Sequence, residues 1–186
     1  LYLMWKVNLL TCVLGALTLG LYICVYTPLK RLTVWNTLVG AIPGALPPLM
    51  GWTASTGSLG AGGWSLFLIL FLWQMPHFLA IAWMYQDQYE QAGYRMMPHV
   101  DPKGTRTARH ALAYALLLLP ISLAPVYFKT AGWVYGAAAL ILGLGFVWQS
   151  CRFYAVIDRS RARQLFFYSI IYLPLLLLAM TFNKAG

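Results

Sequence analysis

The sequence predicts an all-α membrane protein, a polytopic bundle of transmembrane helices, and three observations carry this prediction. Hydrophobic residues make up 61% of the 186 residues and charged residues only 9%, whereas soluble domains carry about a quarter charged residues. The mean hydropathy is +0.68. The apolar residues form long runs without a polar face, and a backbone in lipid must satisfy its own hydrogen bonds, which favours helices. We expect a single membrane domain over residues 1–186.

Six of these runs have the length of a transmembrane helix, since a hydrocarbon core about 30 Å thick takes about 20 helical residues to cross. They are Asn8 to Tyr26, Asn36 to Ala54, Trp64 to Tyr85, His110 to Tyr127, Val134 to Phe153 and Leu165 to Phe182. Prolines interrupt the second run at Pro43, Pro47 and Pro48, and the third at Pro76. Proline removes a backbone donor and tends to kink a helix. We expect a cavity beside these breaks, unless the prolines only shape packing.

The basic residues test the six-span prediction and give its orientation. The loops after the first, third and fifth spans carry ten of the thirteen, namely Lys30, Arg31, Arg95, Lys103, Arg106, Arg109, Arg152, Arg159, Arg161 and Arg163. The other side carries Lys6, Lys129 and Lys184. Basic loops stay inside, so this asymmetry places the richer side in the cytoplasm or the mitochondrial matrix. We expect a bacterial inner membrane, with the mitochondrial inner membrane as the alternative.

Tryptophans support the same span ends, because an amphipathic ring prefers the membrane interface. Trp35, Trp52, Trp64, Trp83 and Trp133 all lie near predicted ends. The net charge of +9 suggests nucleic acid only if the cations share a soluble face, and here they lie between apolar segments, so we expect no nucleic-acid partner. The three cysteines, at positions 12, 24 and 151, lack metal-site or redox spacing and are interpreted as apolar filler.

The inner loop after the third span holds three of the four acidic residues, Asp87, Glu90 and Asp101. Asp87 and Glu90 are three residues apart, so on a helix they share a face and could hold one ion together. Mg²⁺ takes one or two protein carboxylates plus phosphate oxygens, and Lys30 and Arg31 on the neighbouring inner loop could bind the remaining oxygens. The pattern indicates a phosphate-bearing substrate. The alternative is that these are ordinary solvated loop charges.

Several exact strings stand out in the first, second and third predicted spans and the loop that follows. They are Val25-Tyr-Thr-Pro-Leu-Lys-Arg31, Asn36-Thr37, Gly40-Ala41, Gly44-Ala45, Pro47-Pro48-Leu-Met-Gly-Trp52, Trp73-Gln-Met-Pro-His-Phe78 and Ala92-Gly-Tyr-Arg-Met-Met-Pro98. Together they resemble the protoheme IX farnesyltransferase, or heme O synthase, family of UbiA-type intramembrane prenyltransferases. The resemblance runs from about Val7 to Leu178. It implies a nine-helix fold of which this chain matches spans four to nine. The three N-terminal helices and the first of two acidic motifs would then be missing, and the chain alone would be inactive.

The resemblance implies that a farnesyl group passes from farnesyl diphosphate to a vinyl group of heme B, giving heme O for the heme A and cytochrome oxidase pathway. Mg²⁺ assists the loss of diphosphate, and the catalytic residues would be Asp87, Glu90, Lys30 and Arg31, with the two acids as metal ligands. Family members commonly have Asp where this chain has Gln88. Either Asp87 takes over that role or this half of the site is weakened.

The predicted substrate-binding residues are Asn36, Trp73, His77, Phe78, Tyr89 and Arg95. Arg95 would face the diphosphate, and aromatic faces, including Trp83, would shield an allylic cation from water. His77 lies deep in the third span after a proline, where it would contact heme or hydrogen-bond a freed carbonyl. For each aromatic residue, simple packing in the bundle is the alternative.

The implied partners are farnesyl diphosphate, heme B and the lipid bilayer, together with contact to heme A synthase or the terminal oxidase assembly. Three other functions remain open at this point: a UbiA-type enzyme with another acceptor, a small polytopic transporter, and a heme-binding electron carrier. Transporters place coupling residues near the midplane. Here the acids lie at the inner surface, and only His77 is well inside a span, which leaves no bis-histidine heme site.

Overall fold

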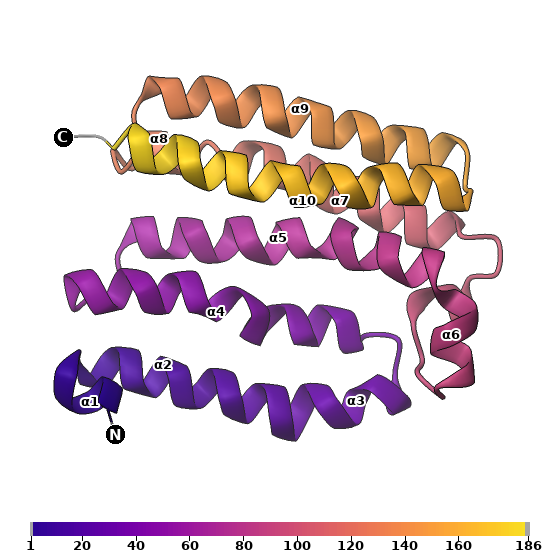
Figure 1. Cartoon of the computed structure of the whole chain (residues 1–186), viewed down its shortest axis with the longest axis horizontal. Helices are drawn as coiled ribbons and strands as arrows, with labels where there is room; N and C mark the ends of the chain where they lie inside the picture. Colours follow the sequence, from indigo (N-terminus) through magenta and orange to yellow (C-terminus); the bar gives the residue numbers. More distant parts are fainter. Residues whose placement is uncertain (1, 185–186) are drawn as a thin grey trace.

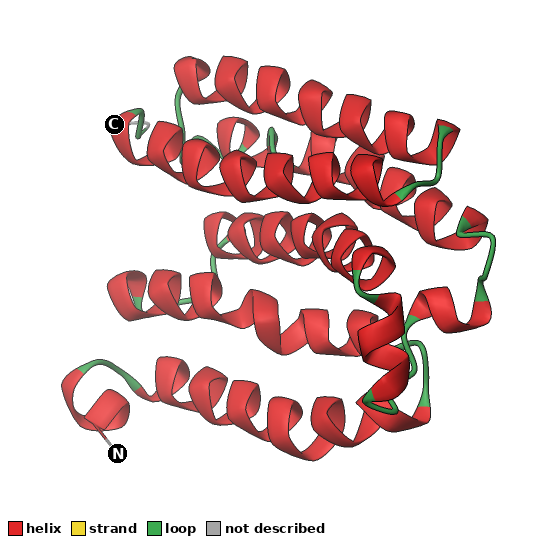
Figure 2. Cartoon of the chain, turned by 45° about the vertical axis from the view of Figure 1, so that its right-hand side comes forward, coloured by secondary structure: helices red, strands yellow, loops and turns green. Residues whose placement is uncertain are grey.

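The computed structural model describes residues 2–184, and these form helices joined by short turns (Figure 1 and Figure 2). The elements are α1 (Tyr2–Lys6), α2 (Leu9–Gly20), η1 (Leu21–Tyr26), α3 (Thr27–Leu32), α4 (Asn36–Thr56), α5 (Ala61–Met84), α6 (Gln86–Gln91), η2 (Met97–Val100), α7 (Thr105–Ile121), α8 (Ala124–Tyr127), α9 (Trp133–Ala155) and α10 (Arg159–Phe182). The predicted all-α class is confirmed.

The long helices lie side by side with α5 in the middle (Figure 1). On one side of it, α4 packs on α5 and α2 packs on α4; on the other, α5, α7, α9 and α10 form a four-helix group. The main core lies inside that group and contains fully buried aromatic rings, those of Tyr135, Phe146, Phe153 and Tyr172. A smaller cluster of Leu14, Leu46 and Leu49 joins α2 to α4.

Within residues 2–184, five helical stretches are long and apolar enough to cross a membrane: Leu9–Leu32, Ala61–Met84, Thr105–Tyr127, Trp133–Ala155 and Arg159–Phe182. The remaining predicted span is α4, which has 21 residues but is less apolar because it is rich in Gly, Pro and Thr. Because α4 packs between α2 and α5, it needs fewer strongly apolar side chains than a helix that faces lipid.

The first span is longer than the sequence predicted, and this changes the setting of two site residues. The π-helical η1 ends at Tyr26 and passes directly into α3, so Lys30 and Arg31 end a helix rather than lie in a loop. Pro28 has no N–H to donate, and it stands in the first turn of α3, directly after the wider π-turn, where that donor is not required.

The prolines do not divide α4 or α5, both of which run continuously through them. A polar contact joins the two helices at this level, since the Gln74 side-chain amide of α5 donates to the Ala41 carbonyl oxygen of α4 over 2.8 Å. Neighbouring side chains of this kind satisfy backbone groups inside a membrane. The predicted cavity does occur between these helices, and it is described below.

Asp101 has a structural role. It is 6% exposed, and its carboxylate accepts from the Thr107 backbone N–H over 2.7 Å and from the Thr107 hydroxyl over 3.0 Å. Thr107 lies in the first turn of α7, where a backbone donor lacks a helical partner. Asp101 therefore caps α7, and of the three acids in this stretch only Asp87 and Glu90 remain candidates for binding a ligand.

Candidate functional site

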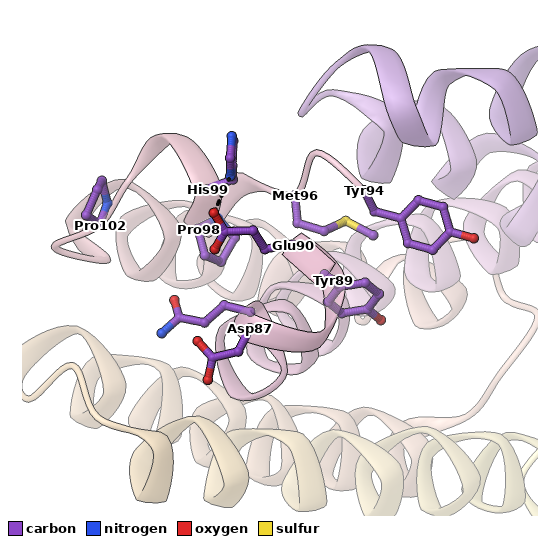
Figure 3. A pocket seen from close by; sticks show the side chains of 9 residues that line it. Asp87, Tyr89, Glu90, Tyr94, Met96, Pro98, His99 and Pro102 are labelled. Atoms are coloured by element: carbon purple, nitrogen blue, oxygen red, sulfur yellow. Dashed lines mark ion pairs between the residues drawn. The ribbon is translucent and has the colours of Figure 1, made fainter. Parts of the chain in front are cut away.

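A polar hollow of about 320 Å³ opens at the α6 end of the bundle (Figure 3). Its lining consists of Gln86, Asp87, Tyr89, Glu90, Tyr94, Met96, Pro98, His99 and Pro102. The short α6 supplies four of these side chains, and the stretch leading into α7 supplies the rest. Asp87 and Glu90 therefore line the same hollow.

The two carboxylates have different partners. Asp87 forms an ion pair with Arg159 at the start of α10, whereas Glu90 lies 3.8 Å from the His99 ring nitrogen (Figure 3). Their side chains are 58% and 69% exposed, respectively. Exposed contacts of this kind contribute about 1 kcal/mol at most. Asp87 can therefore exchange Arg159, and Glu90 can exchange His99, for a metal or a ligand at little cost.

A second cavity of about 220 Å³ lies deeper, between η1, α4 and α5. It is lined by Tyr22, Tyr26, Thr37, Gly40, Gly44, Gln74, Phe78, Ala82, Tyr89 and Met96. Tyr89 and Met96 also line the polar hollow, so the two spaces adjoin. We call the deeper one the membrane pocket. One ligand can thus place a charged group in the polar hollow and an apolar chain in the membrane pocket.

Tyr89 stands between the two spaces and keeps its proton. Burial raises the pKa of its phenol, and the neighbouring Tyr85 and Tyr94 raise it further. A raised phenol pKa means that the neutral form persists through the ordinary pH range and is lost only at more alkaline pH than usual. Tyr89 is therefore a neutral hydrogen-bond donor at the junction.

Lys30 approaches the membrane pocket from α3. Its ammonium group lies 4.5 Å from the ring centre of Tyr26 and 5.8 Å from that of Tyr22, and both rings line this pocket. The Lys30 carbonyl accepts from the Arg95 backbone N–H over 2.9 Å, which ties α3 to the loop after α6. Arg31 is exposed and lines neither cavity.

Asn36 and Arg95 fasten this region together. Asn36 is fully buried, and its side-chain amide donates to the carbonyls of Thr33 and Arg95, each over 2.6 Å. The Arg95 guanidinium reaches the Leu32 carbonyl at 3.5 Å. Because the amide of Asn36 is engaged with backbone, its predicted contact with substrate is replaced by a role in positioning the loop beside α3.

Trp73 and His77 face α10 rather than the membrane pocket. The Trp73 indole N–H donates to the Ser169 carbonyl over 2.8 Å, and His77 Nδ1 lies 2.7 Å from the Ser169 hydroxyl. That hydroxyl donates to the Phe166 carbonyl over 2.5 Å, so we assign the proton to His77 Nδ1. The other ring nitrogen, Nε2, then carries a free lone pair.

The aromatic residues predicted as walls divide into three places. Phe78 and Tyr89 line the membrane pocket. The His77 ring stacks between Trp73, at 4.9 Å, and Phe166, at 5.1 Å. Trp83 is buried in the main core with Phe153, so its predicted place at the site is wrong. Because α5 is largely apolar on all of its faces, the sequence did not show which way Trp73, Phe78 and Trp83 point.

Several lining residues were not predicted from the sequence: Tyr22, Tyr26, Thr37, Gly40, Gly44 and Gln74 in the membrane pocket, and Arg159 beside Asp87. The sequence signal that could have indicated some of them is the four-residue spacing of Gly40 and Gly44 on α4. A Cβ on Gly40 would lie 2.5 Å from the Tyr26 ring, and one on Gly44 would lie 2.5 Å from the Gln74 side-chain oxygen. Two glycines one turn apart on α4 thus let both side chains approach the helix.

Comparison with known proteins finds relatives similar in sequence to nearly the whole chain. Proteins named protoheme IX farnesyltransferase from Salinibacter ruber and Solibacter usitatus are 52% and 46% identical to this chain over 82% and 97% of its length. The human mitochondrial protein of that name is 46% identical over 94%. The chain spans 54%, 62% and 39% of these relatives, respectively.

The chain is also similar to a solved structure and to a protein-family model. A solved structure of a digeranylgeranylglyceryl phosphate synthase superposes on 94% of the chain and covers 60% of that protein, with a TM-score of 0.78 at 19% identity. The helices of this fold, five of them long and apolar enough to span a bilayer, make the chain an integral membrane protein. Residues 1–171 match the UbiA prenyltransferase family, and the chain belongs to that family.

Proposed function

We propose that this chain takes part in transferring a farnesyl group from farnesyl diphosphate to a vinyl group of heme B, which with the addition of water gives heme O and releases diphosphate. The observation that carries the proposal is the junction at Tyr89 and Met96, where a mouth with two carboxylates meets an aromatic pocket inside the bundle. A prenyl diphosphate has the same two parts, a charged head and an apolar tail. The names of the three relatives favour heme B over other acceptors.

The diphosphate would lie in the polar hollow, where Asp87 and Glu90 would hold Mg²⁺. The donor set fits this ion, because Mg²⁺ takes one or two carboxylates and completes its shell with phosphate oxygens and water. Residues 2–184 contain no cluster of three or more His, Cys, Asp or Glu that would hold a metal without such a ligand. When bound, Mg²⁺ neutralises charge that develops on the leaving diphosphate.

Protein side chains would guide the rest of the reaction. The Lys30 ammonium group lies 4.5 Å from the ring centre of Tyr26, a lining residue of the membrane pocket, and would add positive charge near the leaving group. The prenyl tail would occupy the membrane pocket, where the faces of Tyr22, Tyr26 and Phe78 stabilise an allylic cation and exclude water. Gln88 is absent from the lining whereas Asp87 is present, which supports Asp87 in the role of the family acid.

The test of this function is complementation. The full reading frame that encodes this chain, expressed in a host that lacks its own heme O synthase, is expected to restore heme O. Extracted hemes are separated by chromatography and identified by mass. Recovery of the expressed protein without heme O would overturn the proposed acceptor, and a farnesylated product other than heme O would replace heme B with that acceptor.

For heme B we propose a position against α5 and α10, beside Trp73 and His77. His77→Phe retains the aromatic stack but removes Nε2, so we expect the dissociation constant for heme B to rise about tenfold or more, which corresponds to about 1.4 kcal/mol. The Soret band of heme titrated into the purified protein measures this. His110→Phe, on α7, is the matched control. Equal affinity and an unchanged Soret band in both variants would move the heme elsewhere.

We propose that the α6 end faces the cytoplasm, or the matrix in a mitochondrion. The ten-to-three distribution of basic residues supports this orientation. Labelling of a cysteine introduced at Lys103 by a membrane-impermeant reagent in intact cells would contradict it.

A further inference from the structure

A third hollow, of about 470 Å³, lies at the end of the bundle opposite α6. It is lined by Trp52, Gly62, Leu66, Pro125, Lys129, Thr130, Met180, Thr181 and Lys184. These residues come from the end of α4, the start of α5, the α8 region and the end of α10. In Figure 1 the end of α10 and α8 lie together at one end of the long helices, and α6 lies at the other. The hollow is therefore separate from the prenyl site.

We propose that this hollow binds the phosphate of an anionic phospholipid headgroup, with Lys129 and Lys184 as its cationic ligands. On the predicted outer side the chain carries only three basic residues, Lys6 and these two. Two of the three converge on one hollow, although they are 55 positions apart in the sequence (184 − 129). Two of the three basic residues on this side therefore lie at one site.

The backbone is built to keep the two lysines together. An isolated antiparallel bridge joins Ala131 to Lys184, and the Gly132 N–H donates to the Asn183 carbonyl over 2.8 Å. The Asn183 side chain in turn accepts from the Tyr135 N–H over 3.0 Å. These bonds fix the end of α10 against the turn that precedes α9, and this turn begins with Lys129.

Lys129 itself has an uncommon backbone conformation. Its φ of +55° is the only positive value among the non-glycine residues that the structure describes. Left-handed backbone is unfavourable for a residue with a Cβ and persists where the surroundings impose it. Here the Thr130 and Ala131 N–H groups both donate to the Pro125 carbonyl, over 2.8 and 3.0 Å, which holds the turn.

The charge around this pair is uncompensated by acidic side chains. All four acids, Asp87, Glu90, Asp101 and Asp158, belong to α6, the loop before α7 or the cap of α10, at the other end of the bundle. With α5 spanning 24 residues, the two ends are about 36 Å apart at 1.5 Å per residue. Two ammonium groups held in one hollow repel each other and attract an anion.

The apolar part of the lining identifies the ligand class. Trp52, Leu66 and Met180 line the same hollow as the lysines and offer acyl chains an apolar surface, from which a free phosphate ion would gain nothing. The Trp52 indole N–H is buried and has no acceptor among the described residues, an uncommon state for a buried donor. A phospholipid combines a phosphate with apolar chains, and two lysines favour a phospholipid with net negative charge.

The experiment uses the full reading frame, purified in detergent micelles that contain phosphatidylglycerol with a photoactivatable group high on one acyl chain. Cross-linked peptides are mapped by mass spectrometry. We expect labelling around Leu66 and Met180, and about a tenfold or greater loss of it in the Lys129→Gln, Lys184→Gln double variant, since each lysine near an anionic headgroup contributes about 1 kcal/mol. Lys6→Gln, which removes the third outer lysine, is the control and should retain the labelling.

Three outcomes would overturn the proposal. Equal labelling by a phosphatidylcholine analogue would show that the hollow does not distinguish an anionic headgroup from a zwitterionic one. Full labelling in the double variant would remove the lysines from the site. Competition by millimolar inorganic phosphate would make this a free-anion site rather than a lipid site. None of these outcomes bears on prenyl transfer, because the hollow and the polar hollow share no residue.

Discussion

Asp87→Asn is expected to lower heme O formation about 100-fold or more in a host without its own enzyme. The substitution retains the size of the side chain but removes the charge that would hold Mg²⁺ against the leaving diphosphate. Losing one group that stabilises developing charge typically costs 10²- to 10³-fold in rate. Heme extraction and chromatography measure the product, and an immunoblot of the membrane fraction shows that the variant accumulates.

A matched variant separates this role from a structural one. The partner of Asp87 in the structure is Arg159, and an exposed pair of this kind stabilises the fold by about 1 kcal/mol at most. Arg159→Gln removes the ion pair but leaves the carboxylate, so it should retain most of the heme O. If both variants lose activity equally, Asp87 acts by holding α6 against α10, and its assignment as a metal ligand is wrong.

Gly40→Leu is expected to block the membrane pocket. A Cβ at this position already lies 2.5 Å from the Tyr26 ring, so a leucine side chain must displace that ring or fill the space beside it. We expect kcat/KM for farnesyl diphosphate to fall roughly 10- to 200-fold, the range by which a hydrophobic pocket discriminates small differences in size. Shorter donors such as dimethylallyl diphosphate should lose much less, which a general unfolding effect would not produce.

The control for this substitution lies on the same helix. A Cβ on Gly51 would have no neighbour within 4 Å, so Gly51→Leu adds the same bulk to α4 without reaching the pocket. It should accumulate normally and act on farnesyl diphosphate like the unmodified protein. An equal loss for all donor lengths with Gly40→Leu, or an equal loss with Gly51→Leu, would place the prenyl tail outside this pocket.

The acidic mouth could be predicted from the sequence because charge is rare in this chain. With four acids in 186 residues, the grouping of three of them in one loop is visible without a fold. Their partners could not be predicted, since Arg159 is 72 positions from Asp87 and reaches it only when α10 begins beside α6. The capping role of Asp101 likewise depends on the distance to the Thr107 N–H.

The sequence by itself determined that the chain is a bundle of helices, approximately where the long apolar helices lie, and that three of the four acids gather in one stretch. A backbone surrounded by lipid must satisfy its hydrogen bonds within each segment, so span and class are local properties. Only the tertiary structure decided which faces meet. In lipid, both the outer and the inner face of a helix are apolar, so sequence periodicity does not show that Phe78 turns toward α4 while His77 turns toward α10. Packing of side chains into neighbouring helices sets that rotation, and with it the membrane pocket and the lysine pair at the far end.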